Sequence, residues 1–177
     1  FLSELPEGAK SSKGRALQNV LNIENDDKVN AFISCKMLND VEYVTSHNLV
    51  FATRKGVVKK TCLQEYAHVL AKGKKAIVLR DDDSLVGVEL TDGNSQILLA
   101  NRKGRAIRFE ESKVRAMGRV STGVRGMTLD GDDDYIVGLI TMPEGSENTI
   151  LVLSEKGIGK RSELESYRIT NRGGKGV

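Results

Sequence analysis

The strongest constraint on this chain is a short phrase that recurs along it: a basic residue, a small residue and an aliphatic residue. The phrase stands at Arg15-Ala16-Leu17, Lys75-Ala76-Ile77, Arg125-Gly126-Met127 and Lys175-Gly176-Val177. Its small residue therefore recurs after 60, 50 and 50 positions. A period of this kind is typical of repeat proteins, in which each supersecondary unit buries its apolar face against its neighbours. We therefore expect function on a repeated surface and not in a single pocket.

Two further patterns keep nearly the same step. Lys-Gly pairs stand at 55–56, 103–104 and 156–157, and an aliphatic anchor stands at Leu63, Val114 and Leu164. These patterns predict one domain over residues 1–177 with units at 1–62, 63–113 and 114–163 and an incomplete unit at 164–177. The first unit is about ten residues longer, and we place the extra residues between Cys35 and Asn48. Because the chain opens and stops within a repeat, we expect it to be a piece of a longer array.

Short apolar runs bounded by turn residues predict an all-β chain. We expect hairpins over 49–53 with 57–60, 97–100 with 105–109, and 150–153 with 158–161. Further strands are expected upstream, at 85–90 and 135–141, and short helical turns at 63–66, 112–117 and 162–167. Each unit of about 50 residues then offers three or four strands, which is enough for one blade of a propeller-like array.

The sequence favours a soluble protein in a reducing compartment. It contains no apolar run near the roughly 18 residues of a membrane span, and its start lacks the organisation of a signal peptide. Cys35 and Cys62 are far apart and in no metal-binding spacing, so we expect reduced thiols. These features predict a cytoplasmic protein without a membrane partner.

No catalytic or metal-binding pattern is present in the sequence. His47 and His68 lack a nucleophile at a recognisable spacing. The acidic runs 81–83 and 132–134 lack the ligand spacing of a calcium loop, so we interpret them as solvated turns. We expect no catalytic residue, no metal site and no cofactor in this chain.

Charge alternates along the chain with the structural period. Residues 51–75 hold seven Lys/Arg and one acid, whereas 76–96 hold one Arg and five acids. Residues 101–125 hold eight basic and two acidic residues, and 126–149 hold six acids and no base. Because equivalent segments of repeats share an edge, we expect the Lys-Gly hairpins and the Gly/Lys-rich loops to line one rim, with the Asp turns elsewhere. A basic rim predicts a polyanionic partner, although such residues can also be solvated turns of a protein-interaction propeller.

Several motifs together resemble the C-terminal DNA-wrapping domain of bacterial DNA gyrase A, and the resemblance runs essentially from end to end. The motifs are Leu5-Pro6-Glu7, Ser12-Lys13-Gly14-Arg15, Thr53-Arg54-Lys55-Gly56-Val57-Val58-Lys59-Lys60-Thr61, Val114-Arg115-Ala116-Met117-Gly118, Thr122-Gly123-Val124-Arg125-Gly126 and Gly157-Ile158-Gly159-Lys160-Arg161. The resemblance implies a six-bladed β-pinwheel that exchanges strands between neighbouring blades. This chain would form a partial disk of that array.

The family's signature box contains Arg-Gly-Gly-Lys-Gly after a Gln and a basic residue. Here Arg172, Gly173, Gly174, Lys175 and Gly176 supply the core, while Thr170 and Asn171 stand where Gln and Lys/Arg are expected. We therefore interpret 172–176 as a degenerate, later copy of the box.

The resemblance also implies a function, namely sequence-independent binding, bending and wrapping of double-stranded DNA around the basic outer edge. The whole enzyme would be a type II topoisomerase, an isomerase that supercoils DNA with ATP and Mg²⁺ bound by other domains. Its partners would be the N-terminal cleavage region of gyrase A itself and the gyrase B protein, in a heterotetramer of the bacterial nucleoid. The equivalent C-terminal domain of topoisomerase IV remains an alternative.

The candidate phosphate contacts are the cations of the repeated hairpins and loops. They are Lys13, Arg15, Arg54, Lys55, Lys59, Lys60, Lys72, Lys74, Lys75, Arg102, Lys103, Arg105, Arg108, Arg115, Arg119, Arg125, Lys156, Lys160, Arg161, Arg168, Arg172 and Lys175. Since alternate residues of a strand face opposite sides, we expect about half of them to contact DNA.

Overall fold

The Lys-Gly pairs of the sequence lie at the tips of three β-hairpins in a computed structural model, which describes residues 5–19, 21, 23, 28–35, 37–68 and 73–177. The tip glycines Gly56, Gly104 and Gly157 have φ angles of 82°, 80° and 80°. This left-handed region is open to glycine and disfavoured for other residues. The recurring glycine therefore fixes where each hairpin turns.

The strands agree closely with those predicted, except for a two-residue strand at 124–125 that was not expected. They are β1 (Asn48–Thr53), β2 (Val57–Cys62), β3 (Leu85–Thr91), β4 (Ser95–Asn101), β5 (Ala106–Glu110), β6 (Val124–Arg125), β7 (Ile136–Pro143), β8 (Thr149–Leu153) and β9 (Gly159–Glu163). The helical elements are short: α1 (Val41–Ser46) and the 3-10 turns η2 (Leu17–Asn19), η3 (Leu63–Tyr66), η4 (Glu111–Lys113) and η5 (Leu164–Ser166). The prediction of a β fold with single helical turns after each hairpin is confirmed.

The first two hairpins are each completed by a strand that comes later in the chain. Strand β3 pairs with β1 and not with β4, and β7 pairs with β4 and not with β8. Strand β6 pairs with β2, which gives the sheet orders β3-β1-β2-β6, β5-β4-β7 and β8-β9. The first sheet thus takes strands from three of the predicted units, as expected for exchange between neighbouring blades. The unit boundaries themselves stay a prediction.

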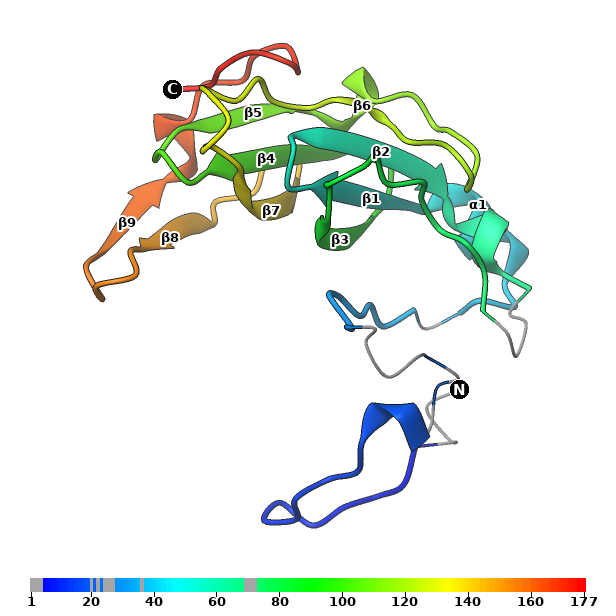
Figure 1. Ribbon diagram of the computed structural model, residues 1–177. Coiled ribbons are helices and arrows are strands. Elements are labelled where there is room, and N and C mark those ends of the chain that lie inside the picture. The colour runs from blue at the N-terminus through cyan, green and yellow to red at the C-terminus, as the bar shows by residue number, and fades with distance from the viewer. Residues whose placement is uncertain (1–4, 20, 22, 24–27, 36, 69–72) are drawn as a thin grey trace.

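The three sheets follow one another along an arc (Figure 1). Strands β3 and β7 lie on its concave side, while β6 and the loop that carries the C-terminus lie on its convex side. No helix among the described residues has the length and apolar character needed to cross a membrane.

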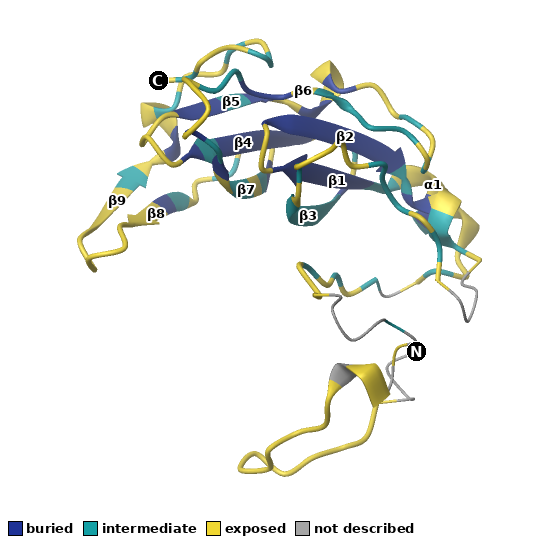
Figure 2. Cartoon of the chain, viewed as in Figure 1, coloured by how far each residue is buried: buried dark blue, intermediate teal, exposed yellow. Residues whose placement is uncertain are grey.

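The core lies where the first two sheets pack together. Val50 and Ala52 of β1 contact a cluster that includes Leu99, Phe109 and Met127, and all five are buried. Strands β1, β2, β4 and β5 are dark along most of their length in Figure 2, whereas β8 and β9 are mostly exposed. The hairpins inside the array are therefore covered by neighbours, and the last hairpin among the described residues is not.

The structure changes one assignment in the repeat. Lys60, Arg108 and Arg161 occupy equivalent places in the three hairpins. They lie opposite Val50, Leu98 and Leu151, near the middle of the first strand of each hairpin. Three positions later come Leu63, Glu111 and Leu164, which begin η3, η4 and η5 and are 1%, 0% and 2% exposed. The prediction that Val114 is the equivalent of Leu63 and Leu164 is wrong, because a buried glutamate occupies that place.

Candidate nucleic-acid interface

Most of the candidate cations are at the surface. Exposed side chains belong to Lys13, Arg15, Arg54, Lys55, Lys75, Arg102, Lys103, Arg105, Arg115, Arg125, Lys156, Lys160, Arg161, Arg168 and Lys175. Lys74, Arg108, Arg119 and Arg172 are half-buried, and Lys72 lies outside the described residues. Lys13 and Arg15 belong to an N-terminal segment that lies apart from the sheets in Figure 1.

Lys59 and Lys60 are buried in β2 and do not reach the surface, so their assignment to a surface rim is wrong. Lys59 is 0% exposed and Lys60 is 8% exposed. The pleat of β2 sends them to opposite sides of the sheet. The Lys60 ammonium lies 3.6 Å from Oε1 of Glu111 and donates to the Glu111 carbonyl at 3.2 Å.

Arg108 also makes internal contacts instead of facing solvent as a rim cation. Its Nη1 donates to the carbonyls of Leu164 and Tyr167 at 2.8 and 3.1 Å, and its Nε donates to Gln96 Oε1 at 2.8 Å. The bond to Leu164 repeats the bond from Lys60 to Glu111, one blade further on. This cation of the second hairpin strand therefore joins consecutive blades.

The hairpin tips lie directly against the acidic turns, so the prediction that the Asp turns sit elsewhere is wrong. The Lys55 ammonium donates to the Asp81 carbonyl at 3.0 Å, and the Lys55 backbone N–H donates to Asp83 Oδ1 at 2.9 Å. The Lys103 ammonium lies 2.7 Å from Asp133 Oδ1. This hydrogen bond raises the pKa of Lys103 and lowers the pKa of Asp133. Acidic turns thus offset much of the charge at the tips.

Adjacent tips are also tied through an aromatic ring. The guanidinium of Arg54 stacks 3.5 Å from the ring centroid of Tyr135, and that of Arg102 lies 5.7 Å from it. Such cation–π contacts hold arginines in place at exposed sites.

A different set of segments is rich in cations and contains no acid of its own, although Arg119 pairs with Glu65 at 3.7 Å and Lys175 pairs with Asp130 at 3.4 Å. We name the segments 73–80, 113–128 and 168–177 the border loops. Together they contain ten Lys/Arg and no Asp or Glu. Those cations are Lys74, Lys75, Arg80, Lys113, Arg115, Arg119, Arg125, Arg168, Arg172 and Lys175.

Hydrogen bonds join the border loops in series. Val78 N donates to the Ser121 carbonyl at 3.2 Å, which ties the first loop to the second. Gly173 N donates to the Gly126 carbonyl at 2.6 Å, and Arg172 Nη1 donates to the Arg125 carbonyl at 3.0 Å. The second loop carries β6, which lies with the third loop on the convex side of the arc (Figure 1). The Gly/Lys loops of successive repeats therefore meet along one border.

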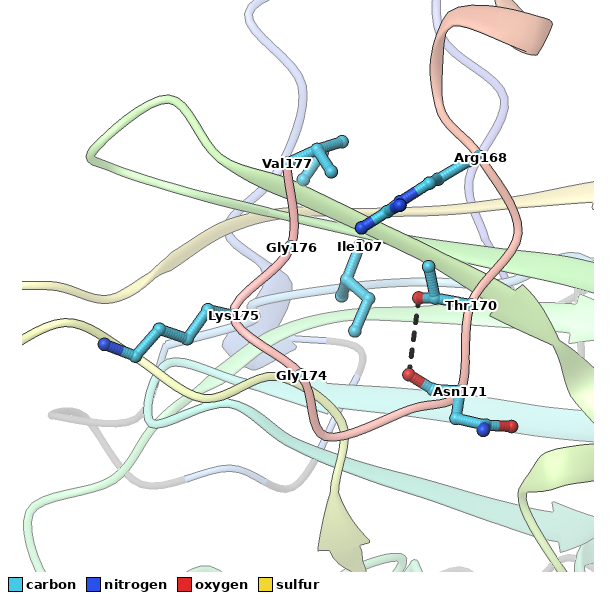
Figure 3. Close-up of a pocket in the computed structure, with 9 residues that line it drawn as sticks. Ile107, Arg168, Thr170, Asn171, Gly174, Lys175, Gly176 and Val177 are labelled. Carbon is cyan, nitrogen blue, oxygen red and sulfur yellow. Dashed lines mark hydrogen bonds between the residues drawn. The ribbon is translucent and has the colours of Figure 1, made fainter.

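The degenerate box forms part of the third border loop and folds around a small cavity of about 220 Å³ (Figure 3). Arg168 extends into the space between the two arms of this loop, whereas Lys175 points away from it. Gly176 has a φ of 75°, and a Cβ there would meet the Ala106 carbonyl oxygen at 2.5 Å. Glycine is therefore required at this place of the box, because the loop backbone lies directly on β5.

Sequence reasoning missed two cations of the border loops, Arg80 and Lys113. Arg80 lies with Lys55 and Arg125 around an open cleft of about 330 Å³, whose lining residues include no carboxylate. The Lys113 carbonyl accepts from Arg172 Nε at 2.9 Å. Both precede or follow acidic residues in the sequence, so the charge pattern hid them.

The acidic turns have a structural role. Asp134 Oδ2 accepts from Asn101 Nδ2 at 2.6 Å and from Asp130 N at 3.0 Å. Within the part of the chain that the structure describes, no three His, Cys, Asp or Glu side chains gather in a way that could hold a metal ion.

A known protein family and its members match this chain over its repeats. A family model described as DNA gyrase C-terminal domain, beta-propeller, matches residues 2–36, 47–92, 95–141 and 148–177. The DNA gyrase A protein of Staphylococcus aureus is 41% identical over 174 residues, which are 98% of this chain and 19% of that protein. The gyrase A protein of Staphylococcus epidermidis is 40% identical over the same length. The chain thus spans about a fifth of the length of these curated relatives.

Solved structures share the fold. The crystal structure of the C-terminal domain of DNA topoisomerase IV has a TM-score of 0.85 and 32% identity, covering 99% of this chain and 52% of that one. A structure of the DNA gyrase A C-terminal domain has a TM-score of 0.79 at 23% identity, covering 94% of this chain and 53% of that one. The joined repeats, the exchanged strands and the family match lead to one conclusion: the chain belongs to the DNA gyrase C-terminal domain family.

Proposed function

We propose that the border loops bind the backbone of double-stranded DNA. The observation that carries this proposal is the charge of these loops, which hold ten Lys/Arg and no acid and are hydrogen-bonded in series, with β6 and the C-terminal loop on the convex side of the arc. A convex surface of one sign attracts a polyanion and gives it a curved path. The hairpin tips, whose cations face Asp turns, contribute less.

The expected mode is contact with phosphates and not base reading. The border loops contain no helix that could enter a groove, and their cations stand on loops with many glycines, whose backbone N–H groups can approach phosphates. If roughly 6 to 9 phosphates are neutralised, the plot of log affinity against log salt should have a slope of about −5 to −8. Binding would then depend little on DNA sequence.

A curved border also implies bending. Smooth bending of 20 to 30 base pairs by 40 to 90° costs on the order of 1 to 6 kcal/mol. Several charge-assisted contacts to phosphates, each contributing about 1.5 to 3 kcal/mol, can offset this cost. We expect the chain to bend the duplex that it binds.

In the whole protein, the chain would serve DNA gyrase as a wrapping domain. The support for this is the 41% identity to a DNA gyrase A protein. We propose that the chain supplies no catalytic residue, cofactor or metal, and that ATP and Mg²⁺ act on other domains of the isomerase. Its partners would be the cleavage region of the same polypeptide and the gyrase B protein, in the bacterial cytoplasm at the nucleoid.

Topoisomerase IV is a second candidate, because its C-terminal domain has the TM-score of 0.85. The two differ in the reaction of the complete enzyme. Introduction of negative supercoils into relaxed DNA would favour gyrase, and relaxation and unlinking without supercoiling would favour topoisomerase IV.

A titration of short duplexes at several salt concentrations tests DNA binding itself. We expect similar affinity for unrelated sequences, a steep salt slope, and faster ring closure of short DNA when the chain is bound. Absent or salt-insensitive binding would favour a protein-interaction propeller instead.

A further inference from the structure

Lys59 is the most deeply buried cation among the described residues, and it contacts no carboxylate in that part of the chain. Its side chain is 0% exposed. The ammonium donates to the carbonyl of Ala76 at 2.7 Å and to the carbonyl of Arg119. It also lies 5.5 Å from the ring centroid of Phe51 on β1. A buried ammonium loses its hydration and is retained only where strong acceptors replace the water.

The two carbonyl groups that accept from Lys59 belong to different border loops. Ala76 lies in the first loop and Arg119 in the second. Arg119 Nη1 donates to the Lys75 carbonyl at 3.1 Å, and the Tyr66 hydroxyl donates to the Ala76 carbonyl at 3.1 Å. Lys59 therefore anchors both loops from the sheet beneath them, while Arg119 ties them at the surface.

We propose that Lys59 is a positioning residue, which holds the first two border loops at a fixed spacing and so sets the arrangement of their phosphate contacts. This inference rests on the proposed function, since it concerns the same surface. Lys59 itself does not touch DNA. It acts through Lys74, Lys75 and Arg119, whose backbones it fixes or adjoins.

The position of Lys59 also couples its protonation to DNA. Burial, together with the charge of Arg119, lowers the pKa of Lys59 to about 8. The groups around it are Arg119 from the second loop, Glu65 and Tyr66 from η3, and the uncharged ring of Phe51. Phosphates above the loops add negative potential, which favours the charged ammonium. Binding then takes up a proton, and by linkage the affinity falls as the pH rises from about 7.5 to 9.5.

The experiment compares Lys59→Met, Lys59→Arg and a control that removes another buried lysine of β2. Because Lys60 pairs with Glu111, the control is the double variant Lys60→Met with Glu111→Leu, which removes that pair without leaving a charge unpaired. Hydrogen exchange at the Val78 amide, which donates to Ser121 across the two loops, reports the spacing without DNA. DNA affinity is measured for every protein at about pH 7.5 and 9.5.

We expect Lys59→Met to speed exchange at Val78 and to weaken DNA binding about tenfold, and the control to change neither. Lys59→Arg should restore most of the affinity at the lower pH and remove the dependence on pH that the wild type shows. If Lys59→Met does not fold, the wild-type and Lys59→Arg pH profiles decide. Equal pH profiles of these two proteins, or wild-type exchange and affinity in Lys59→Met, would overturn the inference. Failure of the wild type to bind DNA at low salt would instead overturn the proposed function.

Discussion

Lys60 and Glu111 form a buried ion pair between two blades, with 3.6 Å between the ammonium and Oε1. The same carboxylate accepts from Thr91 Oγ1 at 2.8 Å and from the Ser95 backbone N–H at 3.2 Å. These donors come from β2, β3 and β4, so one glutamate joins the first sheet to the second. Equivalent places in the other repeats hold Leu63 and Leu164, which pack without polar partners.

Glu111→Ala should destabilise the chain strongly. It leaves the Lys60 ammonium buried without its counter-ion, and breaking a buried pair in this way costs about 3 to 5 kcal/mol. Urea unfolding followed by circular dichroism measures the loss. The double variant Lys60→Met with Glu111→Leu should recover part of this loss, because it removes both charges, although the Thr91 hydroxyl and the Ser95 N–H then lose their acceptor. A double variant as unstable as Glu111→Ala would contradict this view of the blade junction.

Neutralising border-loop cations should weaken DNA binding more than neutralising hairpin-tip cations. The variant Arg115→Gln with Arg125→Gln removes two cations from a loop without acids. Each phosphate contact that is lost should reduce the salt slope by about 1. The matched control is Arg102→Gln with Lys103→Gln, since both of these side chains face Asp133. Equal losses of affinity in the two variants would show that DNA affinity depends on the number of cations and not on their location, which would contradict this prediction.

Gly56 and Gly104 have nearly the same backbone conformation but different surroundings. Their φ angles are 82° and 80°, yet an added Cβ at Gly56 would meet the Met127 carbonyl oxygen at 2.6 Å, and one at Gly104 would meet nothing within 4 Å. Gly104→Ala should therefore cost only the left-handed strain, about 1 to 2 kcal/mol. Gly56→Ala should cost more, because it also pushes the second border loop away from the hairpin. Thermal unfolding of both variants tests this order.

The stability of the chain should increase with pH above about 8 through Lys59. The pKa of Lys59 is lowered from 10.5 to about 8 in the folded protein, so the unfolded chain binds more protons between these values. Folding is then favoured as the pH rises through this window, and the full cost of burying the charge applies below it. Urea unfolding at about pH 7.5 and 9.5 should show the rise for the wild type and a smaller one for Lys59→Arg. At these pH values Tyr66, whose pKa burial raises, stays neutral.

The hairpins and the repeat could be predicted from sequence because their signals are local. Gly56, Gly104 and Gly157 each mark a turn, and short apolar runs typical of strands stand beside these turns. Which strands pair across units could not be read in this way. Strand β3 follows one hairpin and precedes another, and its pairing with β1 depends on packing between distant parts of the chain.

The charge pattern predicted a basic border but misplaced some of its members. The sequence places Lys55 in a turn and Lys59 and Lys60 in a strand, but a lysine in a strand can be solvated or buried, and nothing local shows which. Burial became clear only when the strands on both sides of β2 were in place. Likewise, Asp81 and Asp133 stand 26 and 30 residues from the lysines that they contact. The sequence therefore could not show that acidic turns offset the positive charge of the hairpin tips.

The late arrival of β6 has a consequence for synthesis on the ribosome. The first sheet begins at Asn48, but its outermost strand ends at Arg125. During translation the hairpin of β1 and β2 must wait, with its apolar residues uncovered, until that strand has left the exit tunnel. Exposed apolar surface and unpaired strand edges on an incomplete domain are prone to aggregation. A pause in translation while β6 is still inside the tunnel would lengthen this vulnerable interval, whereas a pause after β6 has left the tunnel would come when the sheet can already close.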